Sequence, residues 1–158
     1  MALTPLHSSQ YLTSITKPIQ RVDGSEWGGA LKASIGLLTF TAAGTGTAKM
    51  ITLPAGRKII FPYLSQVFCP AGTSTSDLHV GYSAYVTPAG LAVNADDNAF
   101  LDNADLGAEV DTVLLLPDAD YFILDSVRSV DIEVLIDTAN SPASGELSLK
   151  IVWAQGGK

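Results

Sequence analysis

The sequence predicts an all-β fold: an antiparallel β-sandwich, jelly-roll-like, of about eight strands. Apolar and polar residues alternate with a period of two over 130–136 and 147–154, as they do in half-buried strands. From Leu31 onward, turn signals built from glycine and proline recur about every eight to twelve residues, the spacing of a sandwich or barrel. Because strands with one apolar face need a second layer to bury it, we expect two stacked sheets.

The predicted strands follow one another along the body of the chain. In order they are 35–41, 48–53, 58–69, 77–85, 110–116, 121–127, 130–136 and 147–154. The last two are expected to form a hairpin, because Asn140, Pro142 and Gly145 between them favour a chain reversal. Pro62 cannot donate a ladder hydrogen bond, so it predicts that strand 58–69 is an edge strand or is broken by a bulge.

Residues 1–30 precede this body and show no sustained periodicity. The length of 158 residues fits one domain, so we expect an extended N-terminal arm over 1–30 and a β-sandwich domain over 31–158. The predicted partner-binding residues are the apolar ones of the arm: Tyr11, Leu12, Ile15, Ile19, Val22 and Trp27. A disordered tail needs fewer apolar residues than this. The alternative, a terminus that contacts nothing, stays open at this point.

Charge is scarce and unevenly distributed. Asp, Glu, Lys and Arg make up 16% of the residues, against a usual share of about 25%, which favours a surface covered by partners and a homo-oligomer. The net charge is −7, yet residues 1–60 hold six basic and two acidic residues, whereas 61–158 hold three and fourteen. We therefore expect the two parts to attract each other, within the fold or between neighbours. Nucleic acid is not an expected partner, since the basic residues do not cluster.

No membrane or secretory segment is expected. No apolar run approaches the ~18 residues that span a bilayer, and the start MALTPLHSSQ lacks the basic and apolar regions of a signal peptide. The single cysteine, Cys69, excludes an internal disulfide, and its place at the end of an apolar strand predicts a small buried side chain.

One segment, residues 91–109, breaks the strand rhythm, and we expect a short helical or irregular excursion there. Its candidates for metal ligation are Asp96, Asp97, Asp102 and Asp105, because hard oxygen ligands at short spacing suit Ca²⁺. The spacing is not that of an EF-hand, since no glycine stands at the sixth position and no glutamate closes the loop. The preferred interpretation is a solvated loop whose Asp and Asn residues cap turns, with no metal and no cofactor.

Catalytic motifs are absent from the sequence: there is no GxSxG, HExxH, P-loop, GxGxxG or CxxC. His79 lies on the opposite face of its strand from Leu78 and Val80, so it is expected to be exposed or at a subunit contact. Trp153 is expected in the core. We predict that the protein is not an enzyme. A catalytic pair of aspartates could come from any two parts of the chain, and nothing in the sequence selects such a pair.

Four stretches carry a resemblance to a known family: ITLPAGRKIIFPYLSQVF, DLHVGYSAY, DDNAFLDNADLGAE and DIEVLIDTANSPASGELSLKIVWA. Together they resemble the small β-sandwich virion proteins encoded among the head genes of tailed bacteriophages, over residues 48–155. The resemblance implies a capsid decoration or cement protein that sits on the outside of the capsid as a dimer or trimer. Its implied partner is the major capsid protein, whose neighbouring capsomers it would bridge.

The function we expect is therefore a structural one, cementing the shell with residues 1–30 as the docking arm. An alternative is a head-fibre or tail component that binds a host-surface glycan, with Trp27, Tyr82, Tyr85 and the segment 91–109 facing the sugar. A third is a hydrolase or lyase that uses aspartate carboxylates on the same frame.

Overall fold

The computed structural model describes residues 31–40, 44–72, 76–116, 121–137, 142 and 144–156, and this part of the chain is built almost entirely of strands. The elements are β1 (Lys32–Phe40), β2 (Gly46–Leu53), β3 (Gly56–Ile60), the 3₁₀ turn η1 (Pro62–Leu64), β4 (Gln66–Cys69), β5 (Asp77–Tyr82), β6 (Tyr85–Val86), β7 (Ala92–Val93), β8 (Asp96–Asp105), β9 (Val110–Val113), β10 (Phe122–Ser126), β11 (Val130–Asp137) and β12 (Gly145–Gln155). Within those ranges, no helix is long and apolar enough to cross a bilayer.

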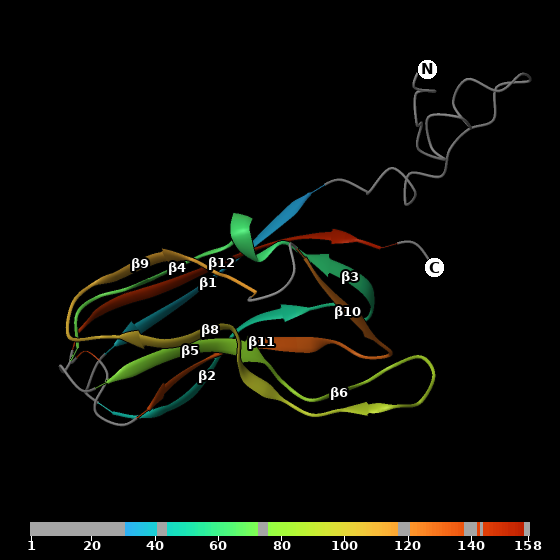
Figure 1. Cartoon of the computed structure of the whole chain (residues 1–158), viewed down its shortest axis with the longest axis horizontal. Helices are drawn as coiled ribbons and strands as arrows, with labels where there is room; N and C mark the ends of the chain where they lie inside the picture. The colour runs from blue at the N-terminus through green and yellow to red at the C-terminus, as the bar shows by residue number, and fades with distance from the viewer. Residues whose placement is uncertain are drawn as a thin grey trace, which may run out of the picture.

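The strands form two stacked sheets, which Figure 1 shows as two layers. In sheet A, β12 is central: β1 pairs along one side of it, and β3 and β4 pair in succession along the other. Strand β10 then adds to β3, and β9 adds to β4. Sheet B has the order β2-β11-β5-β8, and a small hairpin of β6 and β7 extends beside it. Every described pair is antiparallel, so the predicted antiparallel β-sandwich is confirmed.

The core lies between the sheets and is filled by the alternate residues that period two assigned to the inner faces. Along β11, Val130, Ile132, Val134 and Ile136 are buried while the residues between them are partly exposed. An aromatic cluster joins the sheets at one end: the ring of Phe122 in β10 lies 5.2 Å from that of Tyr82 and 5.4 Å from that of Phe100. Burying such side chains stabilises the fold by about 2 kcal/mol each.

The predicted hairpin of the last two strands is wrong. Strand β11 pairs with β2 and β5 in sheet B, whereas β12 pairs with β1, β3 and β4 in sheet A. The connection between them therefore crosses from one sheet to the other. Alternation shows which side chains face the core, but two strands that face each other across a core alternate in the same way as two strands in one sheet.

Pro62 interrupts the predicted strand 58–69, as expected, and it stands at the start of η1 between β3 and β4. Neither strand is an edge, because β3 lies between β10 and β12 and β4 lies between β12 and β9. The Ser65 hydroxyl bridges the gap in the ladder. It accepts a hydrogen bond from the Val152 N–H at 2.9 Å and donates one to the Phe61 carbonyl at 2.9 Å. The sheet thus continues past a residue that cannot donate.

The expected helical or irregular excursion at 91–109 is also corrected, because residues 96–105 form the ten-residue strand β8. Its register with β5 shifts twice, between Leu78 and Val80 and between Val80 and Tyr82, and Asn103 has a positive φ of 53°. Such bulges place two residues of one strand opposite one of its neighbour. The period of two is lost in the sequence for that reason, although the segment is a strand.

Candidate interaction surface

The outer face of sheet A carries large apolar side chains among polar ones, although it points away from the core. Its outward side chains on β1, β12, β4 and β9 form what we call the apolar face: Ala33, Ile35, Leu37, Thr39, Glu146, Ser148, Lys150, Val152, Gln66, Phe68, Asp111 and Val113. Strand pairing arranges them in rows. One row runs Leu37, Ser148, Phe68, Asp111, and the next runs Ile35, Lys150, Gln66, Val113.

Several large apolar side chains on this face are open to water. Ile35 is 67% exposed, Leu37 61% and Val113 46%. A shallow hollow of about 350 Å³ lies among them, lined by Ile35, Gln66, Phe68, Asp111, Ser148 and Lys150. At its border the Gln66 amide donates to Asp111 Oδ1 at 2.6 Å. Exposed large apolar side chains that gather on one outer face are typical of a site that a partner covers.

The outer face of sheet B is acidic instead. We call its outward charged side chains the acidic face: Lys49, Asp77, His79, Asp102, Asp105, Asp131, Glu133 and Asp137. The Lys49 ammonium lies 2.6 Å from Asp131 Oδ2, and the Thr52 hydroxyl donates to Asp131 Oδ1 at 2.7 Å. These hydrogen bonds lower the pKa of Asp131, and the bond to Asp131 raises the pKa of Lys49. The pair joins residues 1–60 to 61–158 and is one instance of the attraction expected between the two parts.

His79 is buried on the acidic face, which corrects the expectation that it would be exposed. Its side chain is 8% exposed, with Nδ1 3.1 Å from Asp102 Oδ1 of β8 and Nε2 3.3 Å from Asp137 Oδ1 of β11. One imidazole therefore connects three neighbouring strands. Gly81 shows how closely β8 approaches: a Cβ there would overlap the main-chain oxygen of Asp96, so the start of β8 lies tightly against β5, the strand with which it pairs.

The four aspartates considered for a metal do not converge. Asp102 contacts His79, Asp105 Oδ1 accepts the Gly107 N–H at 2.7 Å, and Asp96 Oδ1 accepts the Asn98 N–H at 3.4 Å. Asp97 is exposed at the start of β8, next to Asp96. Among the residues that the structure describes, no group of three His, Cys, Asp or Glu side chains is placed to hold a metal ion. Of the four, Asp105 caps the turn that follows β8, whereas Asp96 and Asp102 make their contacts within the strand and to its neighbour β5.

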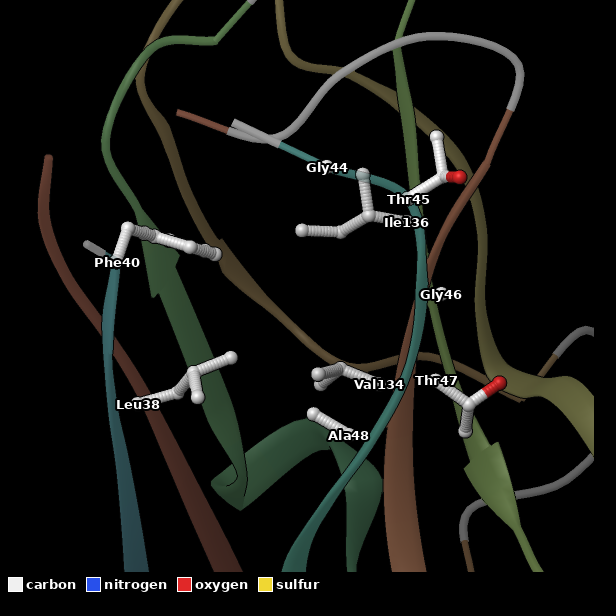
Figure 2. A pocket seen from close by; sticks show the side chains of 9 residues that line it. All are labelled: Leu38, Phe40, Gly44, Thr45, Gly46, Thr47, Ala48, Val134 and Ile136. Atoms are coloured by element: carbon white, nitrogen blue, oxygen red, sulfur yellow. The ribbon is translucent and has the colours of Figure 1, made fainter. Parts of the chain in front are cut away.

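A groove opens where the free edges of the two sheets meet. In the middle of β1, Gly36 lies against the main chain of Met50 in β2, and only a glycine allows that approach. Farther along, the edges separate around an apolar groove of about 220 Å³, in which Leu38 and Phe40 face Val134 and Ile136 (Figure 2). Pockets for drug-sized ligands are usually larger, from about 300 Å³ upward. The groove has room for one or two apolar side chains.

Other predicted residues fall into three groups. The arm residues Tyr11, Leu12, Ile15, Ile19, Val22 and Trp27 lie outside the described residues. Cys69 and Trp153 are buried as predicted, and burial raises the pKa of the Cys69 thiol to about 12. Tyr82, a predicted sugar-facing residue, is only 8% exposed and packs against Phe100, so that prediction is wrong; Tyr85 is half-buried against it.

Lys58 is a feature that the sequence reasoning missed. It is in phase with the inward-facing Ile60 of β3, and this phase was the available signal. Its side chain is fully buried, and its ammonium donates to the carbonyls of Ala55 at 2.7 Å and Gly56 at 3.1 Å. Burial lowers the pKa of this lysine. The contacts hold the turn between β2 and β3, which indicates a structural role.

Comparison with solved structures identifies chains of the same fold. A chain in the capsid asymmetric unit of cyanophage Pam1 is 14% identical, with a TM-score of 0.55 over 96% of this chain and 99% of that chain. A chain in the capsid of Ralstonia phage GP4 is 14% identical, with a TM-score of 0.58 over 83% and 88%. One in the acidic stable capsid of Helicobacter pylori bacteriophage KHP30 is 13% identical, with a TM-score of 0.51 over 82% and 91%. No family model and no curated protein matches the sequence.

Proposed function

We propose that this chain is a virion structural protein: a capsid decoration or cement protein on the outer shell that stabilises contacts between major capsid proteins. The observation that carries the proposal is the shared fold. The likeness to the Pam1 capsid chain spans 96% of this chain and 99% of that one, so it covers nearly all of both chains. The apolar face supports the proposal, because a protein whose task is assembly needs such a surface.

The proposed action is binding that favours the assembled particle. A protein that binds the closed shell but not its free subunits shifts the equilibrium toward the shell by mass action. Contacts of one molecule with two capsomers would strengthen this effect, because the second contact forms at a high effective concentration. No covalent bond is made or broken in this mechanism, so the protein needs only a stable fold and surfaces that bind the shell.

Two parts of the chain are assigned to these tasks. The sandwich supplies the body, with its charged side chains engaged on the acidic face by pairs such as Lys49–Asp131. Residues 1–30 serve as the docking arm, through Tyr11, Leu12, Ile15, Ile19, Val22 and Trp27. The arm precedes β1 in the chain, the strand that carries Ile35 and Leu37 of the apolar face. A shell contact made by the arm would therefore place the apolar face close to the site of assembly.

Co-sedimentation with shells of the virus that encodes the protein tests this function. The full chain should pellet with assembled shells and raise the temperature at which they dissociate, and it should not bind free capsid subunits. Deleting residues 1–25 should lower the bound amount at least tenfold and leave the melting curve of the sandwich unchanged. Replacing Tyr11, Leu12 and Ile15 by serine should act likewise, whereas replacing Ser8, Ser9 and Gln10 by alanine is the matched control. Unchanged binding after deletion would refute the arm's role, and no binding by the full chain would refute the function.

A further inference from the structure

We propose that the apolar face of sheet A is covered by the same face of a second copy of this chain. This inference deepens the proposed function, on which it rests for its biological setting, by assigning the surface through which the protein self-associates. It starts from exposed area. Strand β1 has nine residues and is about 30 Å long, but β4 and β9 have four residues each and are about 13 Å long, so these strands and β12, about 4.8 Å apart, span roughly 400 Å². This is about half of the ~800 Å² that each partner buries in a complex of standard size, so the face fits a reversible contact.

Charge selects a second copy as the occupant. The molecule carries a net charge of −7, so two copies repel each other unless they meet where negative charge is lowest. The acidic face gathers six carboxylates with Lys49 and His79. The apolar face has only Asp111 and Glu146 with Lys150. Contact through the acidic face would bring like charges together, whereas the apolar face can meet itself at little electrostatic cost.

One row of the face is self-complementary. If a two-fold axis lies in the contact plane between β12 and β4, then β12 of one copy lies over β4 of the other and β1 lies over β9. Ile35 of one copy then meets Val113 of the other, whereas in the neighbouring row Leu37 lies over Asp111 and Ser148 lies over Phe68. Lys150, which has no ion-pair partner among residues 31–40, 44–72, 76–116, 121–137, 142 and 144–156, then lies over Gln66 and can reach Asp111 of the other copy. The same contact occurs twice, as two-fold symmetry requires.

Analytical ultracentrifugation of the full chain tests the inference. The wild-type chain should sediment as more than one copy, and Ile35→Asp should raise the dissociation constant at least tenfold. Leu91→Asp is the matched control: Leu91 is also 67% exposed, but it lies beside the β6–β7 hairpin, so its change should leave the association intact. Thermal melting of each variant shows whether the sandwich is still folded.

Charge reversal tests the pairing itself. Lys150→Glu and Asp111→Lys should each weaken self-association, because each places like charges opposite each other twice. An equal mixture of the two variants should associate again, since the carboxylate introduced at position 150 of one copy would then face the ammonium introduced at position 111 of the other. The second pair in that mixed dimer keeps its wild-type charges. Three results would each overturn the inference. The wild-type chain could sediment as a single copy, Ile35→Asp and Leu91→Asp could have equal effects, or the two charge variants could fail to associate when mixed. Association of the chain without binding to shells would refute the proposed function alone.

Discussion

The two outer faces of the sandwich are built from the same alternation but reach opposite results. On the acidic face, polar side chains find partners within their own sheet, as Lys49 does with Asp131 and the His79 imidazole does with Asp102. On the apolar face, Ile35 and Leu37 remain more than half exposed. One face therefore contributes to the stability of the single chain. The other leaves apolar surface that only a second molecule can remove from water.

Strand β8 accounts for much of this difference. It pairs with β5 in sheet B, and its first residues, Asp96 and Asp97, lie tightly against Gly81 of β5. Residues 78–82 of β5 are buried on both faces, His79 included, whereas the outward side chains of β1 in sheet A stay exposed. Substitutions on the acidic face should accordingly change folding stability, and those on the apolar face should change assembly instead.

The largest effect is expected from Gly81→Ala. The added methyl group overlaps the main chain of Asp96 and Asp97, which cannot move without displacing β8 from β5. We expect a loss of about 3 kcal/mol in the free energy of unfolding, measured by urea denaturation. Gly44→Ala is the control, because its methyl group would meet nothing within 4 Å. Equal stability of the two variants would mean that β8 does not lie against β5 as described.

His79→Ala should have the next largest effect. The change leaves a cavity between β8 and β11 and removes the contacts at 3.1 and 3.3 Å that connect Asp102 and Asp137 through the imidazole. A loss of about 2 kcal/mol is expected in the same denaturation experiment. His79→Gln, which keeps much of the volume and an N–H donor, should recover part of that loss. If alanine and wild type unfold at the same urea concentration, the imidazole does not connect the strands.

Asp131→Asn should cost about 1 kcal/mol at pH 7, because the hydrogen bonds from Lys49 and Thr52 are made to a charged acceptor. The pH dependence has a defined sign. The folded-state pKa of Asp131 is lowered, so its contribution is complete above about 3.8 and is lost as the pH falls through the folded-state value. The stability curves of wild type and Asp131→Asn should therefore converge in acid. A constant difference between pH 7 and pH 2 would contradict this assignment.

The smallest effect on the single chain is expected from Ile35→Thr and Lys150→Ala on the apolar face. Both side chains are directed outward, and threonine keeps the preference for a strand, so unfolding should change by less than about 0.5 kcal/mol. The measurement needs a dilution at which the wild type is a single copy. Destabilisation by about 2 kcal/mol or more at that dilution would show that these residues support their own fold and not assembly.

Local alternation predicted which face each strand turns to the core, and hence the burial of Cys69 and Trp153. It did not identify the partners of each strand, so β11 and β12 were wrongly joined as a hairpin. Pairing depends on contacts between residues far apart in the chain, which no local pattern records.

The candidate surface was harder to predict than the fold. The burial of His79 depends on β8, whose bulges hide its period of two, and Gly81 has meaning only when β8 is known to lie against it. The apolar face joins residues of β1, β12, β4 and β9, and only the sheet order brings Ile35 near Val113. The predicted binding residues of the arm stay a prediction, because they lie outside the described residues.

A cryo-EM map of the virus particle that carries this protein would test the central claim most directly. The account predicts sandwiches on the outer shell with Ile35, Phe68 and Val113 covered by a neighbouring copy, and with the acidic face of sheet B turned to solvent. A particle that lacks the protein would contradict this claim. So would a sandwich whose acidic face makes the contacts while its apolar face is open to water.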